Sequence, residues 1–392
     1  MKLKVLMVLV GILIGFSGIH GALVDVYKKG IIKLVADPSF GKDTDWESIF
    51  FYPSSSLTII PDGSIFIAYG KTSNIIKFTP EGQKVHVFSQ SGMGPGDTNS
   101  PYCSSILDNK YLIVGENAEN RRFSVFDFKG KFISVIRTKS EDFNVTGLKN
   151  GYIAYYTLNF GPDKQKGISV AKVVIHIVNM NSKSDIEFPF GEYEMRNVRL
   201  KSGGMYIPGS FLGQIFLKKT KEGNLLVSNS NSPNIYIYSP DGKLVNRFKL
   251  NYNPFPVTQK YIETIKENAI NSSLPGLRNP ELLKKIRTAI ASIDFGFFFN
   301  QYLPYYNDII VDLEGNFLIF KRTDSFNKSK ETFQVYSPEG KYICETILDK
   351  GMFNLEIDSR APLIQFTSTG IYAYVSYEGE DDTIYKIIKV KL

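Results

Sequence analysis

The side chains that most often carry acid–base or metal chemistry are scarce in this chain of 392 residues. It has three histidines, His20, His86 and His176, and the last two lie in runs of β-branched residues that predict strand interiors. No His-x-x-x-His, Cys-x-x-Cys or Gly-x-Ser-x-Gly motif occurs. The sequence therefore identifies no catalytic residue and no metal ligand, and it does not name a cofactor.

A glycine-rich loop at 92–97, Gly-Met-Gly-Pro-Gly-Asp, is the first segment that could hold a ligand. The backbone N–H groups of such a loop can form an anion-binding concavity, although this one lacks the Lys-Ser/Thr ending of a P-loop. Three glycines and a proline also suit a tight connection between strands, and we favour that interpretation. The candidate ligand-binding residues here are Gly94, Gly96, Asp97 and the nearby Tyr102.

A second candidate is a run of seven aromatic residues, Phe295, Phe297, Phe298, Phe299, Tyr302, Tyr305 and Tyr306. It follows a segment, 258–293, in which two helices are predicted: one capped by Thr258 and one capped by Asn279 with Pro280 at its first position. The helices could form a lid with an aromatic wall for an apolar or sugar-like ligand. We favour the other interpretation, in which the rings seat the helices. The candidate ligand-binding residues are Tyr302, Tyr305 and Tyr306.

The elements that must position these residues are indicated by an internal repeat. Four segments each contain an alternating strand that ends in a turn with glycine, followed by a second strand, which is the pattern of a β-hairpin. A further turn and apolar strand precede each hairpin. The four segments are Asn74–Gly82, Arg122–Gly130, Asn234–Gly242 and Thr332–Gly340.

Six copies of this unit can be counted from the residue at the first turn of each. A four-stranded meander cannot bury both of its faces alone, but neighbouring meanders around a ring can. The sequence therefore predicts an all-β fold, a six-bladed β-propeller of four-stranded antiparallel blades, with a small helical insertion between blades four and five. The apolar segment 30–35 is predicted to complete the last blade. The first-turn residues are Gly63, Asn109, Gly151, Gly223, Gly315 and Gly370.

The repeats and the loop at 92–97 resemble the exported bacterial six-bladed propellers of the NHL-repeat-like and TolB-like kind. The Pro-Asp-Gly turns and the strand starts Asn74-Ile75 and Asn234-Ile235 carry the resemblance. The loop is similar to the Gly-x-Gly-Pro-Gly-Glu-Phe signature of that group, from which it departs at Asp97 and Thr98. The resemblance covers most of the chain and implies the fold; the group is largely without assigned activities.

The N-terminus indicates export. Lys2 and Lys4 precede an apolar run and a small-residue exit, which predicts a signal peptide at 1–22 and a single propeller domain at 23–392. An uncleaved N-terminal anchor is the alternative, and no other segment is apolar enough to span a membrane. The net charge of +7 is spread without a dense basic block, so nucleic acid is not an expected partner. Cys103 and Cys344 are expected to be two separate thiols.

Three functions are compatible with these features. The favoured one is an exported, non-catalytic module that binds a protein or a carbohydrate-like ligand through loops at one mouth of the channel. The alternative is an enzyme of lactonase or lyase type with an oxygen-ligated metal in the channel, which the low histidine count disfavours. The third is a subunit of an envelope complex. An acidic cluster in the last hairpin, read as a solvated turn, comprises Glu378, Glu380, Asp381 and Asp382.

Overall fold

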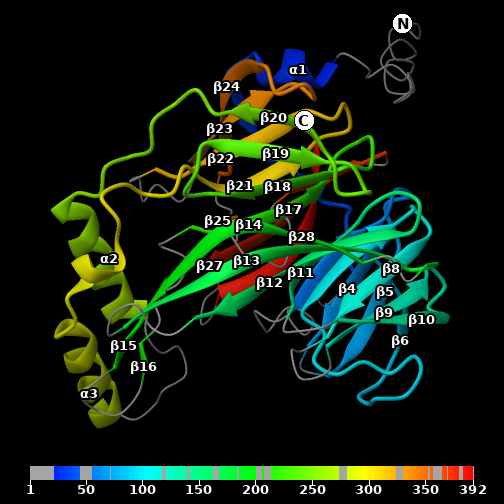
Figure 1. The fold of residues 1–392 in the computed structure, drawn as a ribbon, viewed down its shortest axis with the longest axis horizontal. Helices are drawn as coiled ribbons and strands as arrows, with labels where there is room; N and C mark the ends of the chain where they lie inside the picture. The colour runs from blue at the N-terminus through cyan, green and yellow to red at the C-terminus, as the bar shows by residue number, and fades with distance from the viewer. Residues whose placement is uncertain are drawn as a thin grey trace, which may run out of the picture.

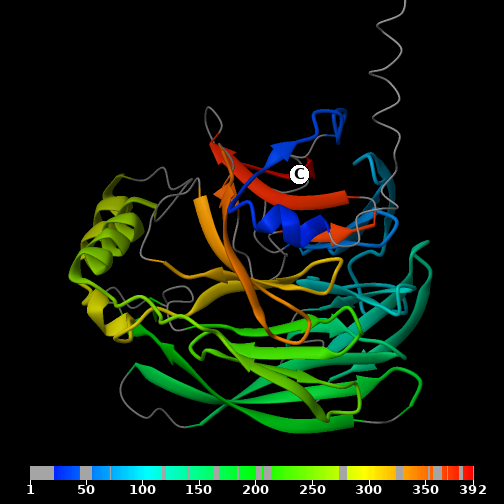
Figure 2. The same cartoon turned by 90° about the horizontal axis from the view of Figure 1, so that it is seen from above.

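The structure, a computed structural model, forms a six-bladed β-propeller (Figures 1 and 2). The prediction of this fold is confirmed, including the helical insertion between blades four and five. The predicted signal peptide lies outside the described residues, apart from Ala22. The described residues are 22–44, 55–70, 72–116, 121–138, 142–161, 167–182, 185–199, 205–206, 213–272, 280–323, 330–351, 354–355, 364–368, 370–378 and 383–391.

Each blade is an antiparallel meander whose first strand lies innermost in the ring. Blades one to three comprise β3 (Ser55–Ile59), β4 (Ile65–Tyr69), β5 (Asn74–Phe78) and β6 (Lys84–Phe88); β7 (Cys103–Leu107), β8 (Tyr111–Gly115), β9 (Arg122–Asp127) and β10 (Phe132–Arg137); and β11 (Asp142–Gly147), β12 (Tyr152–Phe160), β13 (Ile168–Asn179) and β14 (Asp185–Arg196). Blades four and five comprise β17 (Ile215–Lys219), β18 (Leu225–Asn229), β19 (Asn234–Tyr238) and β20 (Leu244–Lys249); and β21 (Tyr306–Val311), β22 (Phe317–Lys321), β23 (Lys330–Tyr336) and β24 (Tyr342–Asp349).

The core lies between neighbouring blades. Every residue of β4 is buried, whereas β6, at the outer edge of the same blade, buries only Phe88. Phe66 and Phe88 of blade one pack in one cluster with Phe126 of blade two, and similar clusters join the other blades. Because the second strand of each blade is covered on both faces, its sequence is a nearly continuous apolar run, as in β4 and β22, whereas the outer strand is largely exposed.

A repeated contact fixes the spacing of the blades on one side. The glycine of the last hairpin turn has a positive φ and packs against the outer strand of the preceding blade. Gly130 approaches Phe88, Gly242 approaches Ile186, and Gly340 approaches Phe248. A side chain at these turns would enter the space of the neighbouring blade, so glycine is required by packing as well as by backbone conformation.

Blade three is longer than the other blades. β13 and β14 each run for 12 residues and pair as far as Ile168 with Arg196. Ile186, Phe188 and Phe190 alternate along β14 with exposed residues and pack against the core between blades three and four. A short pair, β15 (Val198–Arg199) and β16 (Met205–Tyr206), follows.

The ring closes near the N-terminus, and here one prediction was partly wrong. The last blade consists of β25 (Asn354–Leu355) and β26 (Ile364–Thr367) on the inner side, β27 (Gly370–Glu378), β28 (Thr383–Lys391) and β2 (Val35–Ala36). The residues before β2 form β1 (Ile31–Lys33), which pairs in parallel with β24 of blade five instead. Leu34 is the buried pivot between them, so one segment covers the edges of two blades.

A short helix, α1 (Ala22–Tyr27), precedes this segment and packs on blade five. Leu23 and Tyr27 are buried there, and the Tyr27 hydroxyl donates to Asp312 Oδ2 at 3.1 Å. Asp312 also accepts from the backbone and side-chain N–H groups of Asn316, so its buried carboxylate organises the first turn of the blade. No sequence signal predicted this helix.

We expect the stability of the wild-type protein, compared with that of an Asp312→Asn variant, to fall as the pH rises above 3.8. Burial raises the pKa of Asp312 above that ordinary value, and hydrogen bonds from Asn316 and Tyr27 offset the effect only in part. The folded state therefore binds the proton more tightly than the unfolded chain, and this contribution is complete below pH 3.8 and lost as the pH passes the folded pKa. Urea unfolding of both proteins across this range measures the difference, and parallel curves would contradict the prediction.

The insertion contains α2 (Gln259–Ser272), α3 (Pro280–Ala291) and the 3-10 helix η2 (Phe295–Phe298). Thr258 Oγ1 accepts from the N–H of Tyr261 at 3.2 Å, and α3 begins at Pro280, as predicted. The predicted cap Asn279 lies outside the described residues. Both views place α2 and α3 at one extreme edge of the molecule (Figures 1 and 2).

The two cysteines are separate, as expected. Cys103 lies in β7 of blade two and Cys344 in β24 of blade five, and both are free thiols. Cys103 is buried against Phe123 and Ile113 in the core between blades two and three. Both cysteines are therefore part of the strand framework.

Candidate functional site

The two faces of the ring are built differently. In an antiparallel meander, the connections between strands one and two and between strands three and four leave the sheet at one end, and all others leave at the opposite end. The first set consists of tight turns such as 61–63 and 80–82, and we refer to its end as the turn face. The second set includes the connections 89–102, 197–214 and 250–305, and we refer to its end as the loop face.

Hydrogen bonds link the connections of the loop face to one another. The N–H of Tyr305, which precedes blade five, donates to Ser230 O in blade four at 2.7 Å. The Thr98 hydroxyl, which precedes blade two, donates to Ser73 O in blade one at 2.6 Å. Arg322 of blade five donates to Asn307 and to the Tyr261 hydroxyl of α2. The loop face is therefore a connected surface that spans several blades.

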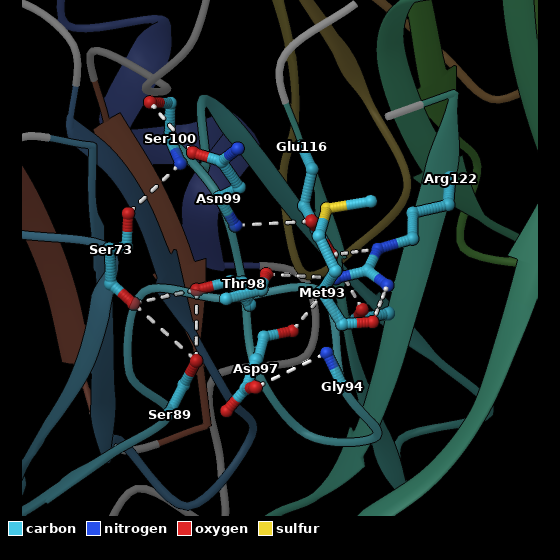
Figure 3. A network of polar contacts seen from close by, with 12 residues as sticks. Ser73, Ser89, Met93, Gly94, Asp97, Thr98, Asn99, Ser100, Glu116 and Arg122 are labelled. Carbon is cyan, nitrogen blue, oxygen red and sulfur yellow. Dashed lines mark hydrogen bonds and ion pairs between the residues drawn. The ribbon is translucent and has the colours of Figure 1, made fainter. Parts of the chain in front are cut away.

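The glycine-rich loop is held by a buried arginine (Figure 3). Arg122, the first residue of β9, donates to Met93 O at 2.9 Å and to Asp97 O at 3.1 Å. Its Nε donates to Glu116 Oε1 at 2.8 Å, and both side chains are almost fully buried. Ser124 and the N–H of Asn99 also donate to Glu116. Both members of the ion pair therefore have further hydrogen-bond partners, as a buried pair requires.

The loop also satisfies its own amides. The Asp97 carboxylate accepts from the N–H of Gly94 at 3.2 Å, and the N–H groups of Gly92 and Asp97 donate to carbonyls within the loop. A Cβ at Gly92 or Gly94 would lie under 3.0 Å from the Asp97 carboxylate, and Gly96 has a φ of +87°. This geometry is that of the tight inter-blade connection, with its carbonyls directed at Arg122. Ligand binding by Gly94, Gly96 and Asp97 stays a prediction.

The helical insertion is attached to blade three by a second arginine. Arg196, at the end of β14, donates to Phe297 O at 2.7 Å, to Phe299 O at 2.9 Å and to Asn300 Oδ1 at 2.7 Å. Phe295, Phe298 and Phe299 are buried against α2 and α3. These rings therefore seat the helices, which agrees with the favoured interpretation of the aromatic run.

Replacing Arg196 with alanine is expected to loosen the insertion without unfolding the blades. The variant leaves two backbone carbonyls of the η2 region without the charged donor, while the sheets lose no ladder bond. Amide hydrogen exchange over 255–303 should speed up by about tenfold or more, with β17–β19 unchanged. The matched control is Arg247→Ala on the outer strand β20, and equal exchange in the two variants would refute the assignment.

The three candidate tyrosines of the second site lie close in sequence but in different environments: Tyr302 and Tyr305 lie in the connection 250–305, and Tyr306 begins β21. Tyr302 is 47% exposed and Tyr305 is half-buried. Tyr306 is 1% exposed and packs on Phe216 in the core between blades four and five, where burial raises the pKa of its hydroxyl. Tyr102 is half-buried beside the core of blades two and three. Of the four candidate tyrosines, Tyr302 is the most exposed to a partner.

Sequence reasoning missed two exposed apolar residues on the loop face. Met93, at the tip of the glycine-rich loop, is 61% exposed, and Phe160, at the loop-face end of β12, is 47% exposed. With Tyr302 they form a set that we refer to as the apolar anchors. A single apolar residue in a loop or at a strand end is not part of a periodic pattern, so the sequence does not single it out. Its exposure in the folded chain identifies it.

Polar side chains of the inner strands pair across blade boundaries. The Ser104 hydroxyl lies 2.8 Å from that of Ser56 and 2.6 Å from that of Thr58. Lys218 forms an ion pair with Asp308 at 2.8 Å. Burial lowers the pKa of Lys219, which the charge of Asp108 offsets only in part. These pairs join the inner strands of adjacent blades.

Among the residues that the structure describes, one group of histidine and carboxylate side chains is close enough to share a metal ion: His176, Asp185 and Glu187. It lies on β13 and β14 in the outer half of blade three, away from the inner strands. His86 lies on the exposed strand β6 and stacks on Phe88. No helix in the described ranges combines the length and apolar character needed to cross a membrane.

Comparisons with known proteins give structural similarity only. No protein-family model matches the chain, and no curated protein matches it. A Bacteroides fragilis protein named as exported is 11% identical, with 86% of this chain and 90% of that protein covered and a TM-score of 0.47. A member of the DUF4221 family from Bacteroides vulgatus is 11% identical, with 91% and 98% covered and a TM-score of 0.45. A catalytically inactive virginiamycin B lyase from Staphylococcus aureus is 13% identical, with 86% and 82% covered and a TM-score of 0.40. These values assign the chain to no family.

Proposed function

We propose that this chain is an exported, non-catalytic binding module, of the NHL-repeat-like and TolB-like kind, that engages another protein through its loop face. One observation carries the proposal: the long connections, the helical insertion and both loop-holding arginines gather at one end of the ring. A connection from the outer strand of one blade to the inner strand of the next has to cross three strand spacings, about 14 Å, which a few extended residues can span. The connections 197–214 and 250–305 are much longer than this crossing requires. Arg122 and Arg196 fix the shape of extended connections, which is the arrangement of a surface that must be presented in one geometry.

The side chains of the loop face suit a protein partner. The apolar anchors Met93, Phe160 and Tyr302 are exposed, and polar residues such as Asn99, Ser100 and Asn300 lie in the same connections. Methionine and aromatic residues are enriched at the centres of protein interfaces, and polar groups are enriched at their rims. Met93 lies in the connection held by Arg122, and Tyr302 follows the segment held by Arg196, so little backbone entropy is lost there on binding.

Export is supported by the basic residues Lys2 and Lys4 and the apolar run after them. The domain organisation follows the same argument: a leader at 1–22 and one propeller at 23–392 that includes the insertion at 258–293. N-terminal sequencing of the protein recovered from outside the cytoplasm tests both. A mature chain that retains Lys2 would indicate an anchor in place of a cleaved leader.

The binding proposal is tested by recovery of partners from an envelope extract after cross-linking to the purified protein. Wild type is compared with a Met93→Glu/Tyr302→Glu double variant and with Leu313→Glu, which places one carboxylate at an exposed apolar residue on the turn face. We expect the double variant to lose about tenfold or more of the recovered protein, and Leu313→Glu to behave like wild type. Equal recovery by all three proteins, or loss only with Leu313→Glu, would refute the proposal.

A glycan array probed with the same three proteins distinguishes the other class of ligand. Binding to glycans that the double variant abolishes, without any protein partner, would overturn the choice of a protein partner. Retention of the thermal transition by each variant is the control for folding. Phe160→Ser, in blade three, tests whether the binding surface of the loop face includes this blade as well.

A further inference from the structure

The outer half of blade three carries a group of metal-ligating side chains that the proposed function does not use. His176 on β13 lies directly opposite Glu187 on β14. Asp185 lies two residues before Glu187 on β14, on the same face of the sheet. One ligand atom from each residue lies within 4.8 Å of the other two. The pairing of the two strands therefore sets an imidazole and two carboxylates around one point.

The imidazole is held in a fixed orientation. His176 is 4% exposed, and its ring stacks on Tyr155 with centroids 4.7 Å apart and planes 7° apart. Its Nε2 lies 3.0 Å from the hydroxyl of Thr157, which is itself buried. With the proton on Nε2 donated to Thr157, Nδ1 presents a lone pair toward the carboxylates. This is how proteins orient a histidine that ligates a metal.

The separation of the ligand atoms fits a shared ion. Nδ1 of His176 lies 3.6 Å from Glu187 Oε1. A direct charge-assisted hydrogen bond would bring such atoms to about 2.7–2.9 Å. Two ligands at about 2.0–2.2 Å from one tetrahedral zinc ion lie roughly 3.4 Å apart. The Glu187 side chain is 41% exposed and Asp185 is exposed, so both carboxylates can adjust while the histidine stays fixed.

We propose that His176, Glu187 and Asp185 bind one zinc ion, with water in the remaining position, and that the ion fastens β14 to β13. An imidazole with two carboxylates is a ligand set that zinc accepts. β14 is the outermost strand of its blade and runs for 12 residues, with a register irregularity opposite Val173–Val174. A ligand bridge across the hairpin would stabilise this edge. The inference is independent of the binding role of the loop face.

Zinc titration of the full-length protein after chelator treatment tests the site. Isothermal titration calorimetry and metal analysis after desalting should give one equivalent with micromolar or tighter affinity, and saturation should raise the thermal midpoint by about 2–5 °C. Glu187→Gln keeps the size of an exposed side chain and should weaken binding by about tenfold or more. Its matched control is Glu192→Gln, five positions along the same strand, which should bind like wild type.

Further measurements separate this site from general histidine binding. His176→Gln should abolish the stoichiometric ion, and His86→Gln on the exposed strand of blade one should leave it unchanged. Cobalt in place of zinc should give visible absorption that the Glu187→Gln variant alters. The absence of a stoichiometric ion in wild type, or unchanged affinity in both Glu187→Gln and Asp185→Asn, would overturn the proposal. Thermal transitions measured in chelator show whether each variant is folded.

Discussion

Replacing Arg122 with alanine is expected to lower the free energy of unfolding by about 3–5 kcal/mol. The variant leaves Glu116, which is 0% exposed, as a buried carboxylate without its cation. It also removes the donors to Met93 O and Asp97 O, so the glycine-rich loop loses its attachment to blade two. Urea unfolding measures the first effect, and amide exchange over 90–99 measures the second.

Two variants show whether the cost arises from the unpaired buried charge. An Arg122→Met/Glu116→Gln double variant removes both charges and should recover part of the lost stability, because no ion remains buried alone. Lys243→Ala breaks the exposed pair with Asp241, whose side chains are 80% and 49% exposed, and should leave the free energy of unfolding nearly unchanged, because solvent screens this pair. A cost below about 1 kcal/mol for Arg122→Ala would contradict the assignment of this pair as the anchor of the loop.

The hairpins could be predicted from the sequence because their signals are local. A Pro-Glu-Gly or Pro-Asp-Gly turn determines the conformation of a few residues and joins the last two strands of a blade, so β5 begins at Asn74, where the repeat predicts it. Ring closure depends on a pairing between the two ends of the chain. Ile31–Lys33 and Val35–Ala36 are both apolar and short, and nothing in either segment indicates which blade edge it joins. The length of β13 and β14 was not predicted either, because a repeat places strands and turns but does not determine how far a hairpin extends beyond them.

The candidate site was predictable only in outline. Its glycine-rich loop is evident from composition, whereas its main partner, Arg122, was recognised only as the first residue of a repeat. The equivalent positions in blades one and four are Asn74 and Asn234, whose amides bond within their own blades. A charged residue at the start of an otherwise apolar strand is the signal that could have indicated a long-range contact. The two residues at which the loop departs from the Gly-x-Gly-Pro-Gly-Glu-Phe signature both have local partners. The Asp97 carboxylate accepts from the N–H of Gly94, and the Thr98 hydroxyl donates to Ser73 O of blade one.

The contact between a turn glycine and the preceding blade leads to the second large effect. Gly340→Ala is expected to destabilise the protein by about 2–4 kcal/mol. A Cβ at this position would lie 2.4 Å from Cγ of Phe248, close to the root of that side chain, and Phe248 itself packs on Phe317 and Tyr336. The ring can move away only by disturbing the core between blades four and five. Thermal and urea unfolding of the variant measure the loss.

The backbone cost and the packing cost can be separated within the same chain. Gly30 has a φ of +81° and Gly340 a φ of +82°, but nothing lies within 4 Å of a Cβ built at Gly30. Gly30→Ala should therefore show the backbone cost alone, about 1 kcal/mol, and the excess in Gly340→Ala belongs to the blade contact. Phe248→Ala, which removes Cγ and Cδ1 but keeps Cβ, should reduce that excess when combined with Gly340→Ala. Equal losses for the two glycine variants would mean that backbone conformation, and not the fit between adjacent blades, selects glycine at these turns.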